Sequence, residues 1–180
     1  MSSHSETSSA TNMKNLIPQY EFDRITDIPD SLLSQFELII FDADNTLVLD
    51  KKVESTPEIT EWLKKLCGDK SCIIVSNSPS FYRWRGEILK EQFAPTGVVL
   101  SRFRKPSKKI YRAILKQTGR ETLDNCIIIG DRVLTDVRFG NRFGLTTILV
   151  KPIGRYRWFY MYPLVLFERA LLVFAKRYTK

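Results

Sequence analysis

The sequence predicts a doubly wound α/β fold, in which about five parallel strands form one sheet with helices on both faces. Short apolar runs alternate with segments of helical periodicity along most of the chain. Most of these runs contain no polar residue, as expected for parallel strands that are buried on both faces. Polar residues follow several runs directly, and in a parallel sheet such strand ends share one edge, where ligands bind.

The expected strands are residues 38–41, 72–75, 97–100, 126–129 and 146–150. The helix after the first strand has the clearest signals. Thr56 and Pro57 suit its N-cap and first position, and apolar residues then recur at helical spacing: Ile59, Trp62, Leu63 and Leu66. Further helices are expected after a cap at Asp30 or Ser31, over residues 80–92, from Pro106 onward, and ending near Gly144.

The chain has 180 residues, enough for one domain with a sizeable core. Its net charge is +8, and residues 151–180 hold seven Lys or Arg residues against one Glu. This asymmetry indicates an anionic partner surface, either a membrane or a nucleic acid. The three cysteines match no metal-binding spacing and are expected to be buried thiols in a reducing compartment. Because His4 is the only histidine, catalytic triads and metal sites that need histidine are nearly excluded.

Three segments are expected along the chain. Residues 1–12 are rich in Ser and Thr and lack both an apolar core and arginine, which predicts a disordered tail and argues against a secretory signal or a mitochondrial presequence. Residues 13–152 form the α/β domain, and residues 153–180 form a basic, amphipathic segment.

Two carboxylates, Asp42 and Asp44, follow the first predicted strand directly. Such a pair at the end of a buried strand costs folding free energy unless a cation or hydrogen bonds compensate it. A polar turn would explain the pair on its own. Three later clusters at strand ends or loops favour a shared site instead: Ser76-Asn77, Lys105-Pro106, and Gly130-Asp131 with Asp136.

With these four clusters in this order, residues 36–152 resemble the haloacid dehalogenase (HAD) superfamily of phosphohydrolases. The resemblance implies a three-layer, Rossmann-like fold and hydrolysis of a phosphomonoester. Phosphoryl transfer needs a nucleophile in line with the leaving group, a proton donor and positive charge on the equatorial oxygens. A response-regulator receiver domain has a similar sheet and similar residue types, but there the lysine comes last, whereas here the acidic GDxxxxD does.

The resemblance also implies a role for each residue. Asp42 is the nucleophile that forms an aspartyl phosphate, and Asp44 is the acid and then the base. Lys105 neutralises charge on the phosphoryl group. Thr46, Ser76 and Asn77 bind the substrate. Magnesium is held by Asp42, by the Asp44 backbone carbonyl and by Asp131, with support from Asp136.

Each of these residues also has an ordinary structural explanation. Asp44 alone suits a turn, and Ser76 suits the end of a strand. Lys105 suits an exposed position before a helix, and Asp136 suits the first turn of a helix, where the dipole stabilises a carboxylate. The joint occurrence of all four clusters favours the catalytic interpretation.

The spacing of the motifs leaves no room for a cap domain, so the site is expected to be open and to suit substrates presented on a large surface. A C-terminal helix from Pro163 would place one group of residues on an apolar side: Phe167, Ala170, Leu171, Phe174, Ala175 and Tyr178. The polar side would hold Glu168, Arg169, Lys176 and Arg177. With the apolar run 158–167, this pattern is typical of an interfacial helix on an anionic membrane. Packing of the apolar side on the sheet or on a second subunit is the alternative.

More narrowly, the segments DADNTLV, VSN, RKPSKK and GDRVLTDVRFGNRFGLTTILVKPI resemble subfamily IIIA phosphatases related to phosphatidylglycerophosphate (PGP) phosphatase. This implies dephosphorylation of PGP to phosphatidylglycerol, the precursor of cardiolipin, by a peripheral protein on the inner face of a membrane. In a eukaryote this would be the mitochondrial matrix or plastid face. Arg83 and Arg104 would bind a second phosphate of the substrate.

Other functions stay open at this point. One is a HAD phosphatase of a soluble phosphometabolite or nucleotide, and another is a non-catalytic adaptor for membranes or nucleic acid. A nucleic-acid partner is not expected, because the aromatic residues lie in a helix-like segment and not on a strand platform. The sequence leaves the oligomeric state open.

Overall fold

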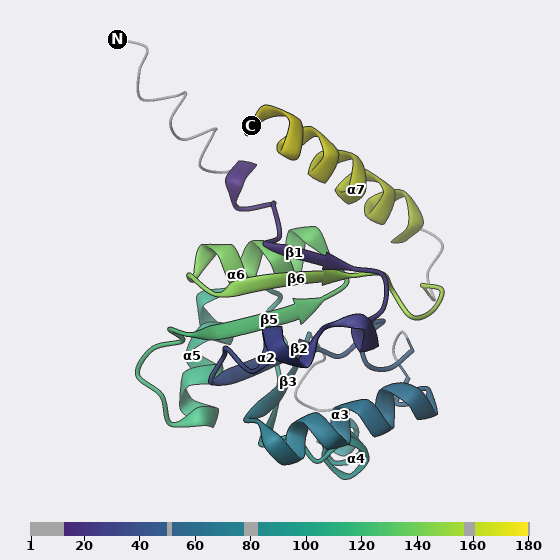
Figure 1. The fold of residues 1–180 in the computed structure, drawn as a ribbon, viewed down its shortest axis with the longest axis vertical. Coiled ribbons are helices and arrows are strands. Elements are labelled where there is room, and N and C mark those ends of the chain that lie inside the picture. Colours follow the sequence, from purple (N-terminus) through teal and green to yellow (C-terminus); the bar gives the residue numbers. More distant parts are fainter. Residues whose placement is uncertain (1–12, 50–51, 78–82, 157–160, 180) are drawn as a thin grey trace.

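The computed structural model describes residues 13–49, 52–77, 83–156 and 161–179. The expected disordered tail (1–12), the start of the helix predicted at 80–92 and the first part of the apolar run 158–167 lie outside these residues. The described chain forms one parallel sheet with strand order β1-β6-β5-β2-β3-β4 (Figure 1). The predicted doubly wound α/β architecture is therefore confirmed.

The six strands are β1 (Tyr20–Phe22), β2 (Leu38–Asp42), β3 (Cys72–Ser76), β4 (Gly97–Leu100), β5 (Cys126–Gly130) and β6 (Thr146–Val150). Five of them are the predicted strands. The sixth, β1, pairs in parallel with β6 through Tyr20 and Ile148 at the sheet edge. It spans three residues with no buried apolar run, so the pattern that identified the other strands could not identify this one.

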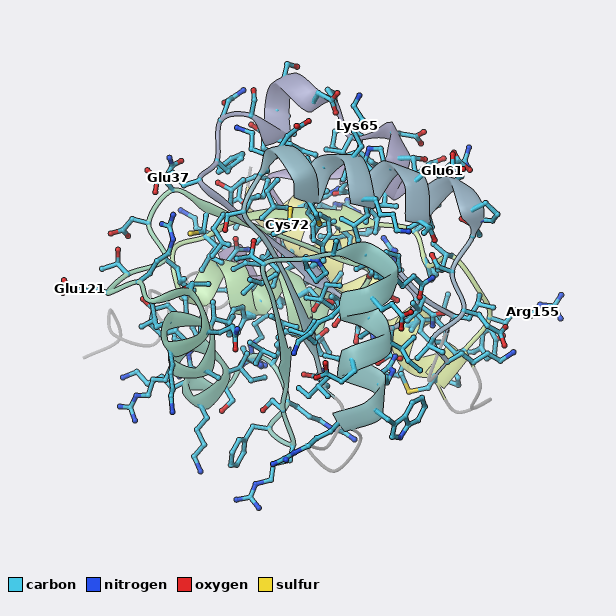
Figure 2. All side chains as sticks on the ribbon, turned by 90° about the horizontal axis from the view of Figure 1, so that it is seen from below. Glu37, Glu61, Lys65, Cys72, Glu121 and Arg155 are labelled. Carbon is cyan, nitrogen blue, oxygen red and sulfur yellow. The ribbon has the colours of Figure 1, made fainter. Side chains whose placement is uncertain are left out.

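The helical elements are η1 (Ile25–Asp27), α2 (Asp30–Leu33), α3 (Pro57–Asp69), α4 (Arg83–Phe93), α5 (Lys108–Thr118), η2 (Val133–Val137), α6 (Arg138–Arg142) and α7 (Met161–Tyr178). Helix α3 begins as predicted, with Pro57 in its first turn and the Thr56 hydroxyl accepting a hydrogen bond from the Ile59 amide at 3.3 Å. Glu61 and Lys65 project outward from α3, whereas Cys72 lies in the interior (Figure 2).

Side chains of β2 alternate between the two faces of the sheet. Ile39 and Phe41 pack with residues of α3 and α4, and Leu38 and Ile40 pack with residues of α5 and α6. Because β2 is fully buried between β3 and β5, its last residue, Asp42, lies at the centre of the sheet edge. Within the described residues, α3 is the one helix between β2 and β3, and α4 the one between β3 and β4, so no cap domain occurs among them.

The cysteines are all free thiols. Cys72 and Cys126 are buried as predicted, whereas Cys67 is only partly buried. None of the described helices is both long and apolar enough to cross a membrane.

Helix α7 lies beside strand β1, at one edge of the sheet (Figure 1). Its buried residues are Glu168, Leu172 and Ala175, and the last two pack with Val133 and Val137. The predicted faces of this helix were therefore partly wrong. Glu168 was expected on the polar side but is buried. Ala175 was expected on the same side as Phe167 and Phe174, but it is buried whereas those two residues are exposed.

The apolar residues Leu166, Phe167, Val173, Phe174 and Tyr178 of α7 are exposed, with Leu166 at 72% and Phe167 at 58%. Helical periodicity gave the relative positions of these side chains but could not tell which side meets the domain. A partly buried arginine partner, described below, draws Glu168 inward.

Candidate active site

Three buried carboxylates converge at the carboxyl edge of the sheet. Asp42 ends β2, Asp131 follows β5, and Asp136 lies in the π-helical turn η2. One oxygen from each carboxylate lies within 4.8 Å of the others, and all three residues are at most 6% exposed. The structure thus brings together residues 94 positions apart in the chain (42 to 136).

Lys105 reaches this cluster from the loop after β4. Its Nζ lies 2.5 Å from Asp42 Oδ1 and 2.7 Å from Asp136 Oδ1, with the lysine side chain fully buried. The amide of Lys105 donates a hydrogen bond to Asn77 Oδ1 at 3.3 Å. Lys105 is therefore not the exposed lysine that its position before a helix would ordinarily give.

Asp136 is held against the sheet by the local backbone. Its Oδ2 accepts hydrogen bonds from the Arg132 amide and the Thr135 hydroxyl, both at 3.2 Å. At Gly130, a Cβ atom would lie 2.4 Å from Asp136 Cγ. Only glycine leaves room for the carboxylate to approach this closely, and this explains the glycine of the GD pair.

Burial controls the protonation of the cluster. It raises the pKa of Asp42 to about 7, with Asp136 and Asp44 adding to the rise and Lys105 opposing it. Burial, followed by the charges of Asp42 and Asp136, also raises the pKa of Asp131 well above its ordinary value. Burial lowers the pKa of Lys105, but the two carboxylates beside it outweigh this effect and raise it overall.

The donor set fits a magnesium ion. Three ionised carboxylates and one ammonium leave two negative charges uncompensated in a buried site. A divalent cation would balance them, and ligands that are all oxygen favour Mg²⁺ over softer metals. The residues that could hold it are Asp42, Asp131 and Asp136. The sequence-based set names the same three residues and adds the Asp44 backbone carbonyl.

Asp44 lies at the entrance of the site and is held by an arginine. Arg85 Nη2 lies 2.6 Å from Asp44 Oδ1, and Nη1 donates to Asp44 Oδ2 at 3.3 Å and to Ser76 Oγ at 3.0 Å. The sequence interpretation selected Arg83 in this segment, two residues earlier. Residues two apart lie on different sides of a helix, and Arg83 is exposed at the first position of α4 while Arg85 is buried.

The predicted substrate-binding residues have different environments. Ser76 is fully buried, and its hydroxyl donates to Asp44 Oδ2 at 3.4 Å. Thr46 is also fully buried, and among the described residues its hydroxyl has no hydrogen-bond partner. Asn77 and Arg104 line the cavity, whereas Thr46, Ser76 and Arg83 are not among its lining residues.

A cavity of about 480 Å³ opens onto the carboxylates. Its lining includes Asp42, Asp44 and Asp131. The lining also includes Leu134, Tyr156 and, from helix α7, Met161 and Leu164. Helix α7 therefore forms part of the site, which its amphipathic pattern did not reveal.

Two further contacts join residues that line the cavity. The Tyr156 hydroxyl donates a hydrogen bond to Asp131 Oδ2 at 2.6 Å. Arg132 pairs with Glu168 of α7, its Nε lying 3.0 Å from Glu168 Oε2. The sequence interpretation assigned Tyr156, Arg132 and Glu168 no role at the site, and no local motif identifies them.

Comparison with known proteins supplies the family. Residues 3–154, more than half of the chain, match the family model described as mitochondrial PGP phosphatase. The "Probable phosphatase YqeG" of Bacillus subtilis (strain 168) is 35% identical over 119 residues, which are 64% of each chain.

Two relatives in photosynthetic organisms are more distant. Phosphatidylglycerophosphate phosphatase 1, chloroplastic, of Chlamydomonas reinhardtii is 29% identical over 123 residues, 66% of this chain and 45% of the relative. The chloroplastic/mitochondrial protein of the same name in Arabidopsis thaliana is 28% identical over 125 residues, 67% of this chain and 36% of the relative. The chain thus spans less than two thirds of the length of each of these three relatives. The match to the family model, together with the four motifs at one sheet edge, shows that this chain belongs to the mitochondrial PGP phosphatase family.

Proposed function

We propose that this protein is a magnesium-dependent phosphomonoester hydrolase that works through an aspartyl phosphate and acts on PGP. The observation that carries the proposal is the buried Asp42 carboxylate, 2.5 Å from Lys105 Nζ and lining a cavity. A nucleophilic carboxylate beside a fixed ammonium and two further acids is what this reaction needs. The names of the relatives support the phosphatase activity and the lipid substrate.

In the first step, an Asp42 oxygen attacks phosphorus, and the bond from phosphorus to the leaving oxygen breaks. Asp44 gives its proton to that oxygen, so that phosphatidylglycerol leaves with a neutral hydroxyl group and not as an alkoxide. In the second step, Asp44 takes a proton from water, whose oxygen attacks phosphorus as the bond to Asp42 breaks. Inorganic phosphate is released and both aspartates regain their starting states.

Positive charge at the site stabilises the negative charge that develops during these steps. Lys105 neutralises the negative charge shared between the phosphoryl oxygens and Asp42. A magnesium ion held by Asp42, Asp131 and Asp136 would supply further charge stabilisation at the phosphoryl oxygens. Asn77 would donate a hydrogen bond to these oxygens, and Arg104, exposed on the cavity rim, would bind a second phosphate of the substrate.

The walls of the cavity support a lipid substrate. PGP joins its terminal phosphate to a diacylglycerol moiety, which must leave the site in contact with protein or membrane. Leu134, Met161 and Leu164 line the same cavity as the carboxylates, and from Leu164 helix α7 continues with exposed Leu166 and Phe167. This apolar continuity provides a path from the reacting phosphate to a bilayer.

We also propose that residues 153–180 dock the phosphatase domain, residues 13–152, on an anionic membrane. The exposed apolar residues of α7 would enter the lipid, and basic residues would meet the headgroups. Lys14, Lys176 and Arg177 line a groove of about 820 Å³ beside Val173, remote from the carboxylates. The names of two relatives give chloroplastic or chloroplastic/mitochondrial locations. For this chain we propose the mitochondrial matrix or plastid face of the membrane.

The test is phosphate release from PGP in mixed micelles, with and without Mg²⁺. Glycerol 3-phosphate in the same buffer separates a lipid phosphatase from an enzyme of soluble metabolites. Asp42→Asn should lower turnover at least about 10⁴-fold while vesicle binding is unchanged. Turnover of glycerol 3-phosphate at the same rate as PGP would reject the lipid substrate, and full activity of Asp42→Asn would reject the mechanism.

A further inference from the structure

We infer that Tyr156 and Glu168 are positioning residues that hold Asp131 in its metal-binding orientation, so that helix α7 sets the affinity of the site for Mg²⁺. This inference rests on the proposed magnesium site. It assigns a role to two residues outside the four motifs, and it gives the C-terminal helix a part in the chemistry that is separate from membrane docking.

The first contact is direct. The Tyr156 hydroxyl donates a hydrogen bond to Asp131 Oδ2 at 2.6 Å, and Asp131 is only 2% exposed. A carboxylate fixed by a hydrogen bond at one oxygen presents the other in a defined direction, and this is how outer hydrogen bonds orient metal ligands.

The second contact holds the residues that follow Asp131. Glu168 Oε1 and Oε2 accept hydrogen bonds from Arg132 Nε at 3.1 and 3.0 Å, and Arg132 Nη2 also pairs with Oε1. Glu168 Oε2 also accepts a hydrogen bond from the Val133 amide at 3.1 Å. One buried side chain of α7 therefore fixes both the arginine side chain next to Asp131 and the backbone at the start of η2.

The two contacts belong to one unit. The Tyr156 ring packs edge-on against Tyr162 of α7, with centroids 6.0 Å apart, and the Arg132 guanidinium lies 6.0 Å from the Tyr156 ring centroid. Leu172 and Ala175 of α7 pack in the same cluster as Val133 and Val137 of η2. A displacement of α7 would move Arg132 and Tyr156 together, and Asp131 precedes the first and is hydrogen-bonded to the second.

The experiment measures Mg²⁺ binding directly, without substrate. Isothermal titration calorimetry with Mg²⁺ compares the full chain with Tyr156→Phe, Glu168→Gln and the control Tyr20→Phe, an exposed tyrosine of β1. Removing a partner of a ligating carboxylate typically weakens metal binding 10- to 100-fold, so about tenfold is expected for each of the two test variants and no change for the control. Raising the Mg²⁺ concentration should restore the kcat of Tyr156→Phe.

Glu168→Gln leaves Arg132 without its counter-charge and can lose stability for that reason. The double variant Arg132→Gln/Glu168→Gln removes both charges and keeps the test possible, and it should bind Mg²⁺ about as weakly as Glu168→Gln. Unfolding temperatures with and without Mg²⁺ separate a positioning role from a structural one. The gain in unfolding temperature on adding Mg²⁺ should shrink in Tyr156→Phe and stay unchanged in Tyr20→Phe.

A folded Tyr156→Phe variant with wild-type Mg²⁺ affinity would overturn the inference, as would a wild-type protein that binds no Mg²⁺. The proposed function can be tested separately from this inference. If the wild-type protein hydrolyses PGP and Tyr156→Phe binds Mg²⁺ normally, the function stands and the inference falls. If Mg²⁺ affinity drops as expected but the wild-type protein does not hydrolyse PGP, the inference stands and the function falls.

Discussion

Arg85 binds both carboxylate oxygens of Asp44, with Nη2 2.6 Å from Oδ1 and Nη1 3.3 Å from Oδ2. The pair lies at the entrance of the candidate site, and Arg85 also donates to Ser76 Oγ. In this ion pair the guanidinium fixes the orientation of the Asp44 carboxylate, which accepts a proton from water in the second step of the proposed reaction.

Arg85→Gln should therefore slow breakdown of the aspartyl phosphate more than its formation. We expect kcat to fall about 100-fold and the phosphorylated enzyme to accumulate, since general-base assistance is worth about 10²–10⁴-fold. Rapid-quench measurement of enzyme-bound phosphate checks this. Arg112→Gln, which removes an exposed arginine of α5, is the control. A variant that turns over slowly without accumulating phosphoenzyme would contradict this role.

The raised pKa of Asp42 predicts how pH affects stability. In the unfolded chain this carboxyl ionises near pH 3.8, but in the folded, metal-free protein it ionises near pH 7. Between these values the folded state binds more protons, so its stability should fall as pH rises toward about 7 and stay low above it. Thermal unfolding from pH 5 to 8 in EDTA measures this, and Asp42→Asn should flatten the profile.

Magnesium should reverse this trend, because the cation binds the ionised carboxylates and competes with protons. Its stabilising effect is therefore expected to grow as pH rises through about 7. An Mg²⁺-induced shift in unfolding temperature that is the same at pH 5.5 and pH 8 would argue that Asp42 does not contact the ion.

Gly130→Ala tests the close approach of Asp136 to the sheet. The added Cβ would lie 2.4 Å from Asp136 Cγ, so the carboxylate must move away from Lys105. Overpacking of this kind typically costs about 1–3 kcal/mol, and we expect a loss of stability in that range together with weaker Mg²⁺ binding.

Gly68→Ala is the matched control for this substitution. It lies in α3, where an added Cβ meets nothing within 4 Å, and should stabilise the helix by about 0.5–1 kcal/mol. Chemical denaturation of both variants gives the free energies of unfolding. Equal behaviour of the two would show that position 130 tolerates a side chain.

Membrane docking predicts that the position of a positive charge matters, and not only the net charge. Lys14→Ala/Arg177→Ala removes two exposed cations from the groove beside α7, and should weaken binding to anionic vesicles about 30-fold at about 1 kcal/mol per charge. Lys64→Ala/Lys65→Ala removes two exposed cations from α3 and should leave binding unchanged. Vesicle co-sedimentation measures both.

Equal losses of vesicle binding in the two double variants would show that only the net charge matters.

The apolar side of α7 can also be covered by a second copy of the chain, and sedimentation velocity without lipid distinguishes that arrangement. If the protein forms a stable dimer without lipid and Phe167→Ala/Phe174→Ala disrupts that dimer, then a second copy of the chain covers this surface and the membrane does not.

Local patterns predicted the sheet and the meeting of the motifs because parallel strands bring their carboxyl ends to one edge. Asp42, Ser76 and Asp131 could be placed together by that rule, whereas Lys105 was placed with them by the resemblance to a known family. The strand β1 could not be predicted, since its three residues depend on the pairing of Tyr20 with Ile148 and not on their own pattern.

The errors at the site have a common physical reason. Arg83 and Arg85 have the same chemistry, and which of them faces Asp44 depends on where α4 begins. Glu168 looks like a surface residue on a helical wheel, because its partner Arg132 is 36 positions earlier in the chain. Such long-range pairs leave no periodic signal in the sequence.

The packing of α7 on η2 offers a route to selective inhibition. A small apolar compound inserted between Leu172 and Val133 would separate Glu168 from Arg132 without entering the phosphate site. Unlike a phosphate mimic, which would act on any phosphatase with these four motifs, such a compound would discriminate by a surface that the motifs do not encode.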